Sequence, residues 1–253
     1  SNHSHVLIGF LTTPVYYPYA FEALVKIGEP AIPFMEECFL LPEVEDVLLL
    51  RIVRIYGKIG TQTAIDALLA KIENQNRSVS RQSMLALKEA KFQSSPANIN
   101  RILNDIVRLI NVMSWNFGAY ASIKNNPDFE MLQDALSEEL SDNYETLYNL
   151  LSLAYNSTSI GNIKQMLDEG NDTDISFAIE LLDQIVNEEI KQVFFPVVEN
   201  IPVNDRFKQL QYFFQGIKED PENLIQDIIT RDFNQISLYV KACALYSILK
   251  LNT

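Results

Sequence analysis

The sequence predicts an all-α protein: an α-α superhelix of stacked helix pairs, with a longer helix pair in the middle. Helix-forming residues dominate the chain, whereas its 253 residues include only 8 glycines and 10 prolines. The phrase Lys-Ile-Gly begins at Lys26 and returns at Lys58, 32 residues later. Apolar residues such as Ile65, Leu68 and Ile72 recur at the spacing of one helix face.

Each copy of the phrase belongs to a unit of helix, glycine turn and helix. Apolar helical stretches, "YAFEALVKIG" and "VLLLRIVRIYGKIG", lead into the two copies, and a new apolar helix follows each. Gly28 and Gly60 stand where a helix commonly ends in a left-handed residue. Residues 79–90 continue the pattern, which indicates a repeat architecture.

The chain after this repeat is less regular. Residues 97–124 and 128–155 each predict a long helix, the first with a kink at Gly118 and the second broken near Ser141–Asp142. We expect residues 97–156 to form a longer, irregular antiparallel pair.

The last helical pattern carries an apolar stripe, which we expect to pack against neighbouring helices. Its members are Leu238, Ala242, Leu245 and Leu249.

These features resemble HEAT repeats, and the short "AL.KIG..AI..L" phrasing is most similar to HEAT units of the phycobilisome-lyase type. The resemblance implies a single HEAT-like α-solenoid domain over residues 1–253. Within it, residues 1–15 are expected to be a tag remnant or an N-terminal cover for the first repeat.

Three further stretches resemble the soluble HEAT region of certain bacterial membrane proteins, where it follows a domain like major-facilitator or nucleotide carriers. They are "RIVRIYGKIGTQTAIDALLAKI", "ETLYNLLSLAYNSTSI" and "AIELLDQIVNEEIKQVFFPVVE". No run of eighteen apolar residues occurs, so we expect no transmembrane segment in this chain. The resemblance implies a membrane tether in a longer protein and a location at the cytoplasmic face of the inner membrane.

The net charge of −13 is concentrated in the second half. Residues 1–126 carry 12 Lys and Arg against 11 Asp and Glu, whereas residues 127–253 carry 8 against 22. Such a surface repels phosphate backbones, so nucleic acid is not expected as a partner. It favours a protein partner with a basic surface.

Catalytic and metal-binding patterns are weak. The only histidines, His3 and His5, lie near the start of the sequence, so Ser–His or Cys–His catalysis is not expected. Neither a metal nor a cofactor is predicted. Cys38 and Cys243 are expected to be buried, reduced thiols.

Acidic residues are interpreted as surface features. The pairs Glu36–Glu37, Glu138–Glu139 and Glu188–Glu189 are expected on solvated helix faces. "DEGNDTD" (residues 168–174) predicts a turn between helices with a cap at Asp172 or Asp174.

Basic residues in the first half form the strongest candidate binding feature. Two sets recur at helical spacing in successive units and are together called the basic ridge: Arg51, Arg54, Lys58, Arg77, Arg81 and Lys88. One interpretation is a site for a carboxylate, phosphate or lipid head group. The other, which we favour, is a structural ladder that joins the repeats.

Two interpretations also apply to Tyr16, Tyr17 and Tyr19. They mark a membrane interface or, as we prefer, cover the open edge of the first repeat.

The sequence therefore predicts a non-catalytic protein-interaction or scaffolding module, a cytoplasmic regulatory part of a larger membrane-associated protein. The alternative is an enzyme or accessory factor on the same scaffold, of the bilin-lyase type or like a DNA glycosylase.

Overall fold

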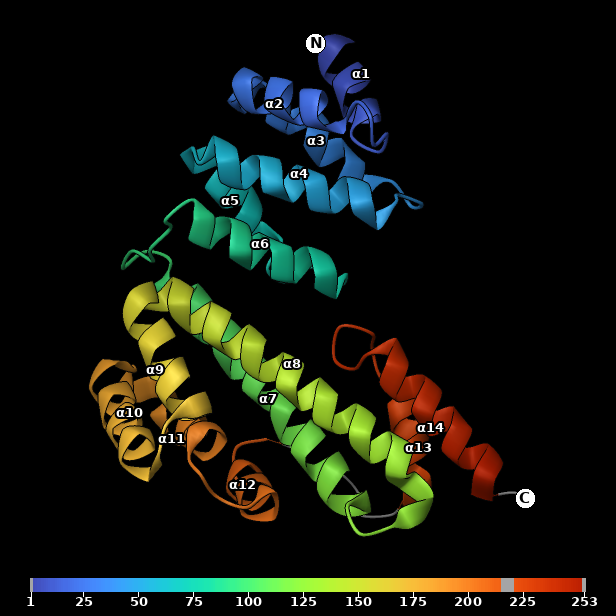
Figure 1. Cartoon of the computed structure of the whole chain (residues 1–253), viewed down its shortest axis with the longest axis vertical. Coiled ribbons are helices and arrows are strands. Elements are labelled where there is room, and N and C mark those ends of the chain that lie inside the picture. Colours follow the sequence, from blue (N-terminus) through green and yellow to red (C-terminus); the bar gives the residue numbers. More distant parts are fainter. Residues whose placement is uncertain (1, 215–220, 252–253) are drawn as a thin grey trace. The chain divides into compact units, whose positions relative to one another are not determined.

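The computed structural model describes residues 2–214 and 221–251, and regular structure in those ranges is entirely helical (Figure 1). The predicted all-α class is therefore confirmed. Contacts divide the chain into two compact units, Ser1–Gln93 (unit 1) and Ser94–Thr253 (unit 2). The expectation of a single domain over residues 1–253 stays a prediction.

Unit 1 contains short helices in an alternating arrangement. α4 packs against both α2 and α6, and α5 packs against α4 and α6. The repeat at Lys26 and Lys58 thus corresponds to helices that neighbour one another in space. The elements are α1 (Asn2–Phe10), α2 (Tyr17–Ile27), η1 (Glu29–Ala31), α3 (Ile32–Glu37), η2 (Cys38–Leu40), α4 (Asp46–Ile59), α5 (Gln62–Ala70) and α6 (Arg77–Glu89).

The two repeat glycines end helices, as predicted. Gly28 follows α2 with φ 72°, and Gly60 follows α4 with φ 63° and ψ 10°, the left-handed helical conformation. Each donates its backbone N–H to the last turn, Gly28 to the Leu24 carbonyl and Gly60 to the Tyr56 carbonyl. A side chain at either position would be strained because its φ is positive.

An ion pair between the buried Lys71 and the partly exposed Glu36 links three elements of unit 1. Lys71 donates to both carboxylate oxygens of Glu36 at 2.7 Å, and the Tyr56 hydroxyl donates to the same carboxylate at 2.6 Å. The Lys71 ammonium also lies 4.2 Å from the centre of the Phe39 ring. Burial, followed by the hydrogen bond to Glu36, raises the pKa of Tyr56. Glu36, expected on a solvated helix face, keeps 39% of its side chain exposed and in addition pairs with Lys71.

Unit 2 is organised around two long helices. α7 (Ile99–Ile123) and α8 (Glu130–Ala154) run side by side and are joined by η3 (Pro127–Phe129). The longer pair is confirmed. The break expected near Ser141–Asp142 was wrong, because α8 is continuous through it. α7 is also one continuous helix, and the kink expected at Gly118 stays a prediction.

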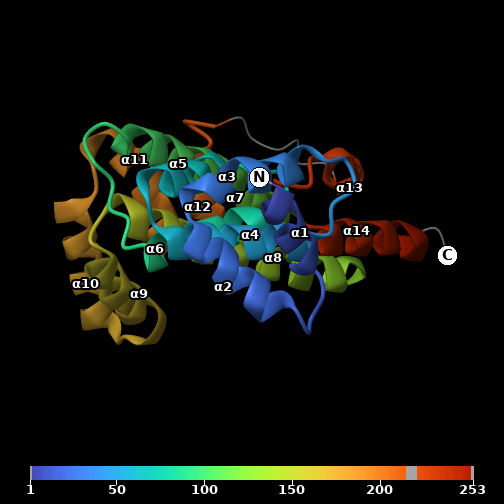
Figure 2. The same cartoon turned by 90° about the horizontal axis from the view of Figure 1, so that it is seen from above.

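The other helices of unit 2 pack on this pair. α9 and α14 contact α8, whereas α11, α12 and α13 contact α7. Figure 2 shows α9 and α10 toward one end of the pair and α13 and α14 toward the other. These helices are α9 (Ser157–Glu169), α10 (Asp172–Ile185), α11 (Glu188–Val198), α12 (Val203–Leu210), α13 (Pro221–Thr230) and α14 (Leu238–Leu251).

The cap expected for α10, at Asp172 or Asp174, needs correction. The cap of α10 is Asn171, whose side chain accepts from the backbone N–H groups of Thr173 and Asp174, while the Asp174 carboxylate accepts from Asn171 N–H. Asp174 therefore takes the third position of a capping box.

The apolar stripe of α14 faces solvent, because Leu238 is 70% exposed, Leu245 50% and Leu249 67%. The buried side of this helix consists instead of Val240, Cys243, Ala244 and Ser247. Cys38 and Cys243 are both buried free thiols, as predicted.

The first testable prediction concerns Gly57, where α4 and α6 approach each other closely. A methyl group at Gly57 would lie 2.9 Å from Ala86 Cβ and 3.1 Å from the Ala86 carbonyl oxygen. We expect Gly57→Ala to lower the free energy of unfolding of unit 1 by about 1–3 kcal/mol, since the two backbones must separate.

The matched control is Gly161→Ala, which is also inside a helix but has no atom within 4 Å of the added methyl. This change should raise stability by about 0.5–1 kcal/mol through helix propensity alone. Denaturant unfolding of both variants checks the contrast, and equal effects of the same sign would contradict the close approach.

Candidate functional site: an acidic pocket in unit 2

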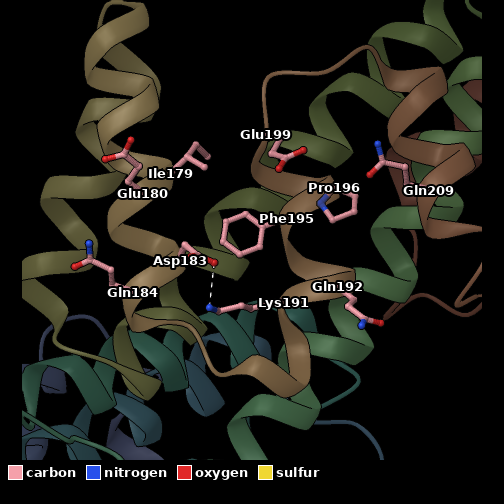
Figure 3. A pocket seen from close by; sticks show the side chains of 10 residues that line it. All are labelled: Ile179, Glu180, Asp183, Gln184, Lys191, Gln192, Phe195, Pro196, Glu199 and Gln209. Carbon is pink, nitrogen blue, oxygen red and sulfur yellow. Dashed lines mark ion pairs between the residues drawn. The ribbon is translucent and has the colours of Figure 1, made fainter.

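A pocket of about 750 Å³ opens between α10, α11 and α12 (Figure 3). Ile179 and Glu180 of α10 lie across from Phe195 and Pro196 of α11. The Pro196 ring interrupts the hydrogen-bonding pattern inside α11. We call this site the acidic pocket, and its lining is Ile179, Glu180, Asp183, Gln184, Lys191, Gln192, Phe195, Pro196, Glu199 and Gln209.

The pocket combines an apolar wall with an excess of negative charge. Its charged lining consists of three carboxylates and the single ammonium of Lys191. Lys191 is already paired, at 3.0 Å with Asp183 and at 2.6 Å with Glu188 (Figure 3 draws the first pair). The hydrogen bond to Glu188 and then that to Asp183 raise the pKa of Lys191.

Two carboxylates at the pocket have no cationic side chain of their own. Neither Glu180 nor Glu199 forms an ion pair with another side chain within residues 2–214 and 221–251. Both residues line the same pocket as Phe195. A long side chain with an apolar stem and a cationic head, such as Lys or Arg, matches this combination.

Arg206 holds the segment that carries Glu199. Its guanidinium donates to the backbone carbonyls of Glu199 at 2.7 Å and Ile201 at 3.3 Å, and to the Tyr144 hydroxyl. The Tyr144 hydroxyl in turn donates to the Val197 carbonyl at 2.7 Å. Burial raises the pKa of Tyr144, and the positive charge of Arg206 partly offsets this effect.

All six residues of the basic ridge belong to unit 1, whereas the residues that line the acidic pocket belong to unit 2. Arg51 donates to the Leu11 carbonyl and stacks on the Tyr17 ring, with its guanidinium carbon 3.9 Å from the ring centre. Arg54 donates to the Gln82 side chain at 3.4 Å, and Lys58 pairs with Glu89 at 3.6 Å. The last two contacts join α4 to α6.

The other three ridge residues, Arg77, Arg81 and Lys88, lie on α6, and each also takes part in an interaction within the protein. α4 and α6 are packed together, so the structure brings the two sets onto adjacent helices. Ligand binding by this ridge stays a prediction.

Residues 11–19, which we call the N-terminal strip, have a buried side and an exposed side. Leu11 is fully buried, whereas Tyr16 is 53% and Tyr19 74% exposed. Tyr17 is half-buried between Arg51 and Phe21, whose ring centre lies 5.7 Å from its own. Of the three tyrosines expected to cover the first repeat, Tyr17 is the half-buried one, while the exposed Tyr16 packs its ring 5.2 Å from that of Phe10.

Sequence reasoning missed the acidic pocket. Asp183 and Lys191 pair across the short turn between α10 and α11, and Gln209 comes from a third helix, α12. The available signals were the acidic second half and Pro196 within "FFPV". Neither signal indicates which carboxylates lie together.

Neither a membrane-spanning helix nor a metal-binding cluster is found in the described part of the chain. None of its helices combines the length and apolarity that a membrane span requires. In the same part, no group of three or more His, Cys, Asp or Glu side chains is arranged to hold a metal ion.

The second testable prediction concerns Arg206. A lysine side chain keeps the positive charge, but it lacks the planar guanidinium that donates to the Tyr144 hydroxyl and to two backbone carbonyls at once. We expect Arg206→Lys to lower the free energy of unfolding by about 1–3 kcal/mol, because buried acceptors lose their donors.

Lys208→Gln on the same helix is the control, since Lys208 is exposed and makes only a 4.0 Å contact with Asp205. It should change stability by less than about 0.5 kcal/mol in the same denaturant titration. An Arg206→Lys variant as stable as the original chain would show that Arg206 does not hold this segment.

Comparison with known proteins gives no relative for this arrangement. No family model, no curated protein and no solved structure matches the chain.

Proposed function

We propose that this chain is a protein-interaction module on a HEAT-like α-solenoid, and that its acidic pocket receives a basic side chain of a protein partner. The observation that carries the proposal is the pair of carboxylates, Glu180 and Glu199, beside Phe195. A cationic head bound there would gain charge-assisted hydrogen bonds, while its stem covers the aromatic wall.

The repeat in unit 1 supports the scaffold part of the proposal. Successive helices α2, α4 and α6 pack in a row, and the phrase that recurs in the sequence ends the first two. Stacked helix pairs of this kind present extended binding surfaces.

The charge of unit 2 supports the nature of the partner. Residues 94–253 carry 11 Lys and Arg against 23 Asp and Glu. A negative surface of this strength accelerates encounter with a basic protein, particularly at low salt. The proposed setting is cytoplasmic, as a regulatory part tethered to a bacterial membrane protein, and the reading frame around this sequence tests the tether.

The third testable prediction uses the full chain as bait in a pull-down from lysate. Proteins captured at low salt should be released at high salt, because salt screens the attraction between charges. They should no longer be captured when Glu180→Gln and Glu199→Gln are combined, because the pocket then carries no unpaired carboxylate.

The matched control is Glu189→Gln, the same change on α11 outside the pocket lining. It should retain the captured proteins. Quantitative mass spectrometry compares the three samples. Equal capture by the double variant and the control would contradict a role for the pocket.

A further inference from the structure

α14 leaves one apolar face open to solvent. Leu238 is 70% exposed, Tyr239 51%, Leu245 50% and Tyr246 51%, and Ala242 is exposed between them. Leu238, Ala242 and Leu245 follow the spacing i, i+4, i+7, and the two tyrosines are also seven residues apart. We call these five residues the α14 face.

The opposite side of the same helix is fully packed. Val240, Cys243 and Ala244 lie in the cluster that α14 shares with α8 and α13. A helix that is apolar on both sides is normally buried on both. The α14 face therefore has the pattern of anchors by which one helix recognises another.

An acidic rim borders the α14 face. Asp134 and Glu138 are exposed on α8, one turn apart, and α8 packs directly against α14. The pKa of the Tyr239 hydroxyl is raised by Cys243 first, through charge and a hydrogen bond, and further by the charges of Glu138 and Asp134. Both carboxylates therefore lie close enough to act on Tyr239.

The nearest lysine of the helix does not neutralise this rim. Lys241 is 9% exposed, donates to the carbonyls of Ile229 and Arg231, and lies 4.3 Å from the centre of the Phe233 ring. The other lysine, Lys250, stands in the last turn of α14. Neither Asp134 nor Glu138 forms an ion pair within the part of the chain that the structure describes.

We infer that the α14 face and its acidic rim dock an amphipathic helix of a protein partner, with an apolar stripe against Leu238 and Leu245 and with Lys or Arg beside Asp134 and Glu138. This inference rests on the proposed interaction role and gives it a second contact, distinct from the acidic pocket. Charge complementarity favours a basic partner helix over a second copy of this chain. A second copy of the chain would bring another net charge of −13 and another acidic rim to the same surface.

The test measures fluorescence anisotropy of two labelled amphipathic peptides with the full chain. Both peptides carry the same leucine stripe, and they differ in having Lys or Glu along its flank. We expect the Lys peptide to bind at least about tenfold more tightly than the Glu peptide, with the difference shrinking as salt is added.

Two variants and one control locate the binding surface. Leu245→Ser should weaken the Lys peptide roughly tenfold, because it removes a central anchor. Leu40→Ser, the same change at a residue that is 84% exposed in unit 1, should leave binding unchanged. Glu138→Lys should shift the preference toward the Glu peptide. Both altered positions in unit 2 are exposed, so the fold should be retained, and circular dichroism checks this.

Several outcomes would overturn the inference. Equal binding of both peptides, or binding that Leu245→Ser does not weaken, removes the α14 face as the site. A dimer that Leu245→Ser converts to a monomer would assign the face to a second copy. If the Lys peptide loses binding only in the Glu180→Gln/Glu199→Gln double variant, the peptide binds the acidic pocket. The pocket proposal would then stand, and the inference about the α14 face would be wrong.

Discussion

The pairing of α7 with α8 is the contact on which the rest of unit 2 depends. Five of the other helices in the described part of this unit contact one or other member of the pair. Isolated helices gain little stability in water, so each shorter helix needs an apolar surface on which to pack. The long pair supplies that surface, which includes Phe117 and Leu132 in its buried core. The acidic pocket and the α14 face are both carried by helices that pack on it.

Buried polar groups fix how the two long helices meet. Asn116 of α7 donates to Asn143 of α8 at 3.5 Å, and Asn143 donates to the Glu139 carboxylate at 3.4 Å. The second oxygen of Glu139 accepts from Ser237 N–H, at the start of α14, at 3.2 Å. Because a buried polar group without a partner costs free energy, this chain of contacts favours one register of α7, α8 and α14. The expectation that Glu139 is solvated was therefore wrong.

Charge has different roles in the two units. In unit 1 the contacts of Arg51, Arg54 and Lys58 join helices or support the N-terminal strip. In unit 2 acidic residues outnumber basic ones, and some of them border apolar side chains. A carboxylate near an aromatic ring that solvent reaches at least in part is suited to a cation with an apolar stem. The same combination occurs at the acidic pocket and along the α14 face, and for that reason we assign both to a basic protein partner.

The sequence by itself determined the helical class, the short units around Gly28 and Gly60, and the long helices of the middle. These features follow from local periodicity and from the need for positive φ at helix ends. Only the tertiary structure decided that Glu139 is buried, that Glu36 meets Lys71, and that the stripe of α14 faces outward. Periodicity places residues on one face of a helix, but which face is covered depends on helices distant in the chain.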